Sequence, residues 1–167
     1  MSILQDLMSW DKKSFDTIEK IYYDYRESPL FIKDIISIVF DGTEEKGSTW
    51  LLKRYLENRG TLKEKDIEKV YNAIPSLRDW EARLHILQSI PYMPIQKESR
   101  EVVESFIREG LTDKNKFVRA WSYNGLYELA TQFPEYKEEV EDLLNAALQY
   151  EAPSAKARIR KILKKGF

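Results

Sequence analysis

The chain contains no cysteine and only one histidine among its 167 residues. The absence of cysteine excludes disulfides, thiolate zinc sites and a cysteine nucleophile. One histidine supplies too few nitrogen donors for a typical metal site, and a triad base needs a partner to position it. His85 lies between Leu84 and Ile86 in an apolar helical segment, so we expect a structural role. The sequence predicts no metal, no cofactor and no catalytic residue.

Glycine and long apolar runs are also scarce. None of the six glycines stands at the spacing of a phosphate-binding loop before a Lys-Ser or Lys-Thr pair. Purely apolar runs extend only a few residues, as in Ile38–Phe40, far below the roughly 20 that span a bilayer. The N-terminus has neither a basic nor an apolar signal region. We therefore expect a cytoplasmic protein that does not enter membranes.

Apolar residues recur at helical spacing throughout, and no segment shows strand alternation. Helices are predicted to end near Pro29, Gly42, Gly60, Pro75, Pro91 and Gly110. Three further helices are predicted at about residues 114–133, 135–150 and 154–164. Gly60 is the expected C-terminal stop of its helix, and Thr61 with Glu64 matches a capping box for the next. The short connections favour antiparallel packing of consecutive helices.

A four-position pattern recurs about every 36 residues. Each copy has a small residue, a cation and two core positions. The copies are Ala82, Arg83, Ile86 and Ile90; Val118, Arg119, Ser122 and Leu126; and Ala155, Lys156, Ile159 and Leu163. A weaker copy, Ser48, Thr49, Leu52 and Leu56, lacks the cation. Such self-similarity is typical of stacked helical hairpins.

Asp113, in a predicted turn, and Arg119, six residues later, resemble a HEAT repeat. The resemblance implies an all-α superhelix, or solenoid, of about four antiparallel hairpins over residues 29–165, with a helical cap over 1–28, in a single domain. It also implies that Asp113 and Arg119 belong to a ladder tying successive turns together. Arg83 and Lys156 match only its cation, and the period is below the usual 40 to 47 residues.

A tetratricopeptide array is the competing assignment. Trp121 with Asn124 and Gly125 is similar to the opening of that repeat. Glu128 stands where a tyrosine is expected, however, and no proline closes the unit. The HEAT-like assignment is favoured, and both predict an all-α solenoid.

Two segments of opposite charge follow one another near the C-terminus. The acidic residues are Glu138, Glu139, Glu141 and Asp142, and the basic ones are Lys156, Arg158, Arg160, Lys161, Lys164 and Lys165. We expect the two helices to neutralise each other partly, each exposed pair contributing about 0 to 1 kcal/mol. The alternative is that the basic helix binds phosphate.

Nucleic-acid binding is therefore the alternative function. Some HEAT-like proteins are glycosylases for alkylated DNA whose concave surface combines Trp, Asp and Arg. The chain offers Asp79, Trp80 and Arg83 on one helix, and Asp113, Arg119 and Trp121 around the next. These residues do not match the family motif in order. A net charge of −1 and a pI near 6.0 disfavour this alternative.

Aromatic residues favour protein recognition. The four Trp and ten Tyr are residue types that interfaces favour, because they combine apolar area with a polar group. Tyr123 and Tyr127 are offset from the core positions of their helix and are expected at the surface. We therefore predict a non-enzymatic scaffold that binds a protein or peptide on its concave helical surface. The candidate site residues are Trp80, Arg83, Arg119, Trp121, Tyr123 and Tyr127.

Overall fold

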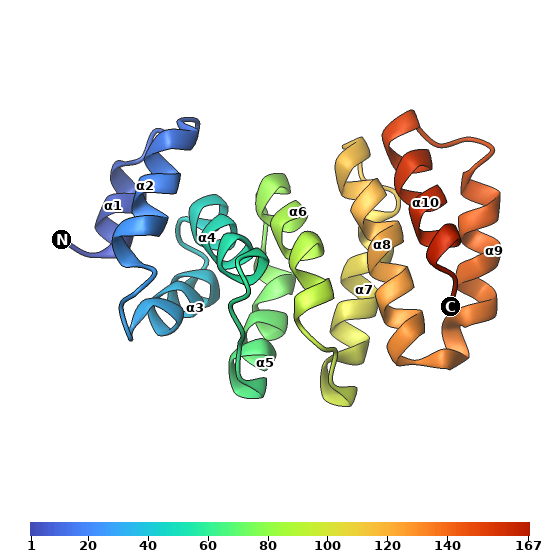
Figure 1. Ribbon diagram of the computed structural model, residues 1–167, viewed down its shortest axis with the longest axis horizontal. Helices are drawn as coiled ribbons and strands as arrows, with labels where there is room; N and C mark the ends of the chain where they lie inside the picture. The colour runs from blue at the N-terminus through green and yellow to red at the C-terminus, as the bar shows by residue number, and fades with distance from the viewer. The chain divides into compact units, whose positions relative to one another are not determined.

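The computed structural model describes residues 1–167 and confirms the all-α prediction. It contains ten α-helices, four short 3-10 helices and no strand (Figure 1). The contacts divide the chain into two compact units, residues 1–93 and residues 94–167. Each unit has its own buried apolar core.

The first unit contains six α-helices. They are α1 (Ile3–Ser9), α2 (Phe15–Tyr25), α3 (Phe31–Asp41), α4 (Glu45–Glu57), α5 (Glu64–Ala73) and α6 (Trp80–Ser89). The 3-10 turns Ile74–Ser76 and Ile90–Tyr92 follow α5 and α6, each with a proline at its second residue. Helix α3 packs against α4 and α5, and α4 packs against α6.

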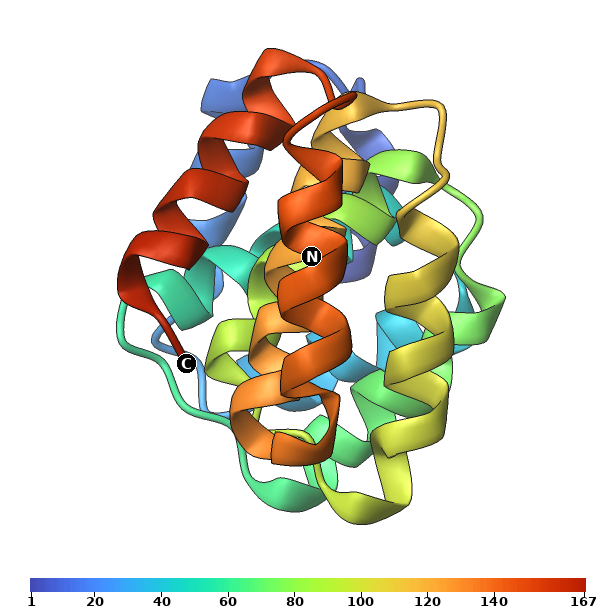
Figure 2. The ribbon, with the colours of Figure 1, turned by 90° about the vertical axis from the view of Figure 1, so that its right-hand side faces the viewer.

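The second unit contains α7 (Arg100–Gly110), α8 (Lys116–Gln132), α9 (Lys137–Ala147) and α10 (Pro153–Lys165), with 3-10 turns at Lys97–Ser99 and Pro134–Tyr136. Helices α8, α9 and α10 alternate in direction (Figure 1). Helix α8 packs against all three of the others, and in Figure 2 it lies behind α9. Most of its circumference is therefore covered.

Side-chain caps explain several helix starts. Ser14, Asp79 and Asn115 accept hydrogen bonds from backbone N–H groups in the first turns of α2, α6 and α8. Gly42 ends α3 in the left-handed region, with φ 69°.

Two predictions between α4 and α5 were wrong. The left-handed residue after α4 is Arg59, with φ 67°, and not Gly60. Gly60 serves a different purpose, because a Cβ there would lie 2.3 Å from Cε1 of Tyr55. Helix α5 begins at Glu64, after Lys63 as the N-terminal flanking residue, and no side chain caps it. The Thr61–Glu64 capping box is therefore absent, since Thr61 lies too early in the chain.

The repeat pattern correctly predicts core positions. In the copies on α4, α6 and α8 the small residue and both core residues are buried, among them Leu52, Ile86 and Leu126. On α10, Ala155 and Ile159 are buried but Leu163 is only half-buried, and the neighbouring Ile162 is buried instead. The core register thus holds until the last turn of α10.

Candidate functional site

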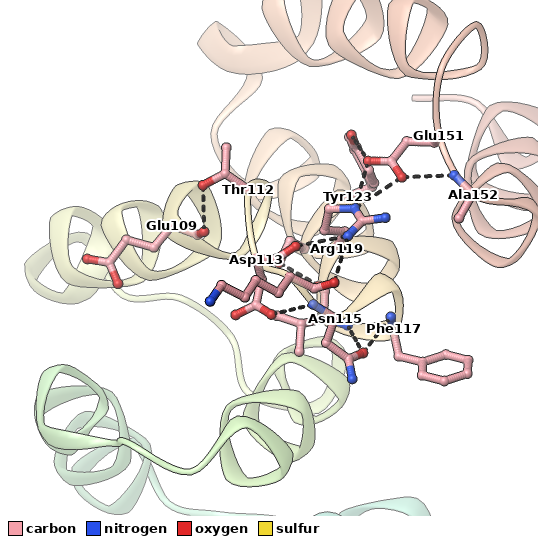
Figure 3. A network of polar contacts seen from close by, with 12 residues as sticks. Glu109, Thr112, Asp113, Asn115, Phe117, Arg119, Tyr123, Glu151 and Ala152 are labelled. Carbon is pink, nitrogen blue, oxygen red and sulfur yellow. Dashed lines mark hydrogen bonds and ion pairs between the residues drawn. The ribbon is translucent and has the colours of Figure 1, made fainter.

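Arg119 belongs to a partly buried polar network and is not a free surface cation. Its Nε lies 3.2 Å from both carboxylate oxygens of Glu151, and its Nη1 donates to the backbone carbonyls of Asp113 and Lys114 at 2.9 and 3.2 Å. The Glu151 side chain is 4% exposed. Figure 3 shows the carboxylate directed toward Arg119 and Tyr123. The network ties the turn before α8 to the turn before α10.

The expected ladder partner of Arg119 was Asp113, and the structure corrects how they interact. Only the backbone carbonyl of Asp113 meets the guanidinium, while its carboxylate accepts from the N–H of Asn115 at 2.8 Å. Glu151 supplies the negative charge. An acid 32 residues after the arginine has no local spacing signal, so the sequence did not indicate it.

Arg83 occupies the equivalent place on α6 and makes a similar backbone contact. Its Nη1 lies 3.5 Å from the carbonyl oxygen of Leu77, six residues earlier, as Asp113 precedes Arg119 by six. In the same unit, the Glu45 carboxylate accepts from the N–H groups of Arg78 and Asp79, both at 2.9 Å. Arg83 and Arg119 therefore each contact the turn that precedes their own helix.

Tyr123 is buried, contrary to the prediction that it lies at the surface. It is 3% exposed, and its hydroxyl donates to Glu151 at 2.9 Å. Burial raises the pKa of this phenol, and the nearby Tyr150 and Glu151 raise it further. The physical reason is that α8 is enclosed by α7, α9 and α10, so a position offset from one core stripe faces another neighbour.

Trp121 and Tyr127 are half-buried against the end of the chain. The guanidinium of Arg158 lies 4.0 Å from the Trp121 ring centroid, close enough for a cation–π contact. The Tyr127 hydroxyl donates to the carbonyl of Gly166 at 3.1 Å, and its ring lies 5.3 Å from that of Phe167. These contacts attach α10 to α8. They leave only part of each aromatic ring exposed for contact with a partner.

Trp80 is the most exposed of the candidate site residues. It is 44% exposed and lies at the first position of α6. Trp80 and Arg83 belong to the first unit, and the other four candidates belong to the second. The six residues therefore do not form one cluster within either unit.

His85 is buried between α4 and α6 and shares a 3.0 Å hydrogen bond with the hydroxyl of Thr49. Burial lowers its pKa to about 3, and the positive charges of Lys53 and Lys46 act in the same direction. The imidazole is therefore neutral at physiological pH, in a packing position.

The acidic helix does not pair with the basic helix that follows it. Glu139 on α9 instead forms a two-pronged pair with Arg108 on α7, at 2.9 and 3.1 Å. Glu135, in the 3-10 turn before α9, pairs with Arg100 at 3.2 Å. The expected neutralisation was wrong because the paired acids lie on the side of α9 toward α7. No ion pair joins α9 to α10.

A groove of about 730 Å³ lies between α3 and α5 in the first unit. Its apolar lining comes from Pro29, Ile32, Ile36, Phe40 and Tyr55. Ile32, Ile36 and Phe40 are spaced four residues apart and form one stripe along α3. Phe40 is 58% exposed, whereas Ile36 is only 4% exposed and forms the floor.

The connection between α4 and α5 forms one end of the groove. The Tyr55 hydroxyl donates to the carbonyl of Thr61 at 3.3 Å, and the N–H of Gly60 donates to the carbonyl of Tyr55 at 2.9 Å. The absence of a side chain at Gly60 lets the chain pass directly over the Tyr55 ring. This connection therefore holds Thr61 and Lys63 beside the apolar stripe.

Positive charges outnumber negative charges along the groove. Lys33, Lys63 and Lys69 line it against a single acid, Asp66. All three lysines are exposed, and none forms an ion pair, whereas six other cations of the unit do. Those six are Lys12, Lys20, Arg26, Lys46, Lys53 and Arg54. The groove thus combines an apolar floor with available positive charge. The groove has no signal in the sequence, because its lining comes from three separate segments.

No group of His, Cys, Asp and Glu side chains comes together as a metal site. None of the helices has both the length and the apolar character that crossing a membrane requires. Comparison with protein-family models, curated proteins and solved structures finds no match to the chain.

Proposed function

We propose that the protein is a non-enzymatic, HEAT-like interaction module that binds a protein or peptide partner in the α3–α5 groove. The observation that carries the proposal is the apolar stripe at the groove, where Phe40 is exposed, Ile32 is half-buried and Ile36 forms the buried floor, flanked by polar groups. The volume of the groove falls within the roughly 300–1,000 Å³ typical of ligand sites. Burying such a stripe supplies the main free energy of association.

The HEAT-like assignment is supported by the recurring buried positions and by the packing of α4 on α6 and of α8 on α10. In a stacked-hairpin protein, second helices of successive repeats pack in this way. The centre of the binding surface moves from the predicted α8 residues to α3 and α5, because Arg119 and Tyr123 are engaged internally.

Peptide display against the immobilised protein tests the proposal, with a groove-filling variant and a matched control. Ser37 is exposed and lines the groove on α3, whereas Ser105 is exposed on α7 in the other unit. Both lie in the middle of eleven-residue helices. Enriched peptides should bind the wild type and Ser105→Trp but lose affinity for Ser37→Trp. Enrichment of no peptide, or equal binding to all three proteins, would contradict the proposal.

The second candidate function is nucleic-acid binding through α10. It is favoured by the exposed cations Arg160, Lys161, Lys164 and Lys165, none of which forms an ion pair, although Lys165 lies over the Tyr127 ring. Titration of a labelled short duplex tests it, since phosphate binding must weaken steeply as salt rises. Salt-insensitive or absent binding would exclude this function.

A further inference from the structure

The unpaired lysines around the α3–α5 groove identify the chemistry of its partner. We infer that the groove takes an acidic amphipathic helix of another protein, whose apolar side chains cover Phe40 and the half-buried Ile32 while its carboxylates meet the three lysines. This inference rests on the proposed function and adds the charge and the shape of the partner.

The shape follows from the spacing of the apolar stripe. Eight residues separate Ile32 from Phe40, which is about 12 Å along a helix. A partner helix presenting apolar residues at i, i+4 and i+7 spans a similar length, and this is a recurring mode of helix recognition in a groove. The elongated apolar floor therefore fits a short amphipathic helix.

The sign of the partner's charge follows from the charges that line the groove. Lys33 lies on α3 beside Ile32, Lys69 lies on α5, and Lys63 lies on the connection that ends at α5. The cations therefore surround the apolar stripe from three segments of the chain. Asp66 alone cannot neutralise them, so the lining carries a net charge of about +2. An acidic helix gains attraction on every side of its apolar contact.

Two peptides that differ only in charge test the inference. Both are helical peptides of about 16 residues, long enough to form a helix on binding, with Leu and Phe on one face. One carries Glu on its flanks and the other carries Gln. Fluorescence anisotropy with the full chain at about 50 mM salt should give about tenfold tighter binding of the Glu peptide. The preference should shrink at about 500 mM salt, where the Debye length is only a few ångströms.

Substitutions of the three lysines test whether they cause the preference for the Glu peptide. A triple variant, Lys33→Glu with Lys63→Glu and Lys69→Glu, should reverse the preference for the Glu peptide. Replacing the same lysines by Gln should abolish it. All three positions are exposed and none of these side chains forms an ion pair, so circular dichroism should show an unchanged fold. Ser37→Trp should weaken both peptides, and Ser105→Trp neither.

The outcomes separate this inference from the proposed function. Equal affinity for the Glu and Gln peptides, with both weakened by Ser37→Trp, would overturn the acidic partner and leave the groove as a peptide site. No binding of either peptide, with no peptide enriched by display, would overturn both. A short duplex or an anionic vesicle that binds through the three lysines while the Glu peptide does not would also overturn the acidic helix.

Discussion

At the scale of single residues, the clearest consequence concerns His85, the only histidine of the chain. Its pKa lies near 3 in the folded protein, against about 6.5 in the unfolded chain. The folded state therefore excludes a proton that the unfolded state accepts. The free energy of unfolding is therefore highest above pH 6.5. It declines as the pH falls toward 3, because the proton binds His85 in the unfolded chain.

We expect the free energy of unfolding to fall by about 1.4 kcal/mol between pH 7.5 and pH 5.5, since each pH unit below 6.5 costs about that amount. Urea denaturation at both pH values measures it. The window stays above the range in which ordinary carboxylates titrate. In His85→Gln, which has no imidazole, stability should be nearly the same at the two pH values. An equal pH dependence in the variant would show that another group is responsible.

Arg59 carries a second residue-scale prediction. It adopts φ 67° after α4. Its backbone N–H donates to the carbonyl of Leu56 at 3.2 Å, and its side chain forms no ion pair or hydrogen bond. The left-handed conformation costs an L-residue about 1 kcal/mol or more relative to glycine, although glycine loses more entropy on folding. Arg59→Gly should therefore raise the unfolding free energy by about 0.5 kcal/mol in a urea titration. A destabilised variant would mean that the side chain contributes packing.

At the scale of elements, most helix boundaries were predictable because Gly, Pro and caps mark them locally. The predicted helix ending near Gly42 is α3, and the segment 154–164 is α10 within a residue. Contacts between distant segments were not predictable in the same way. Glu151 meets Arg119 across 32 residues, and the groove combines α3, α5 and the connection between α4 and α5. Periodicity describes one face of one helix and contains no information on which helix covers the next.

The link between α8 and α10 is testable through Glu151. Glu151→Gln removes the charge that faces Arg119 and leaves a guanidinium in a partly buried place. Breaking a fully buried pair costs about 3–5 kcal/mol. Because the Arg119 side chain is 22% exposed, we expect a smaller loss of about 2 kcal/mol in a urea titration. Glu141→Gln, at an exposed position of α9, is the control and should change stability by less than about 0.5 kcal/mol. Similar values for both variants would show that the network contributes little.

The end of the groove depends on Gly60. In Gly60→Ala, the new methyl group would overlap the Tyr55 ring, 2.3 Å from its nearest carbon, and either the ring or the connection must move. Overpacking of this kind costs about 1–3 kcal/mol. We expect that loss of stability together with weaker peptide binding in the groove. Unchanged binding in the folded variant would show that the Tyr55–Thr61 contact does not shape the site.

At the scale of the whole molecule, four of the six predicted site residues and the groove lie in different compact units. In the second unit, Arg119, Tyr123, Trp121 and Tyr127 serve mainly to hold α8 and α10 together. In the first unit, the groove leaves Phe40 exposed, Ile32 half-buried and three lysines without an ion-pair partner. The proposed binding function therefore belongs to the first unit, and a ligand should stabilise that unit directly.

Thermal unfolding with the acidic peptide tests this assignment. A ligand at about 100 times its Kd stabilises the folded state by about 2.7 kcal/mol. For a chain of this size, that raises the transition temperature by roughly 5–10 °C. If the units unfold in separate transitions, only the transition of residues 1–93 should move, because the whole groove lies within them. Ser37→Trp should show no shift and Ser105→Trp the full one. A peptide-induced shift confined to the transition of residues 94–167 would place the site on α8 and α10 instead.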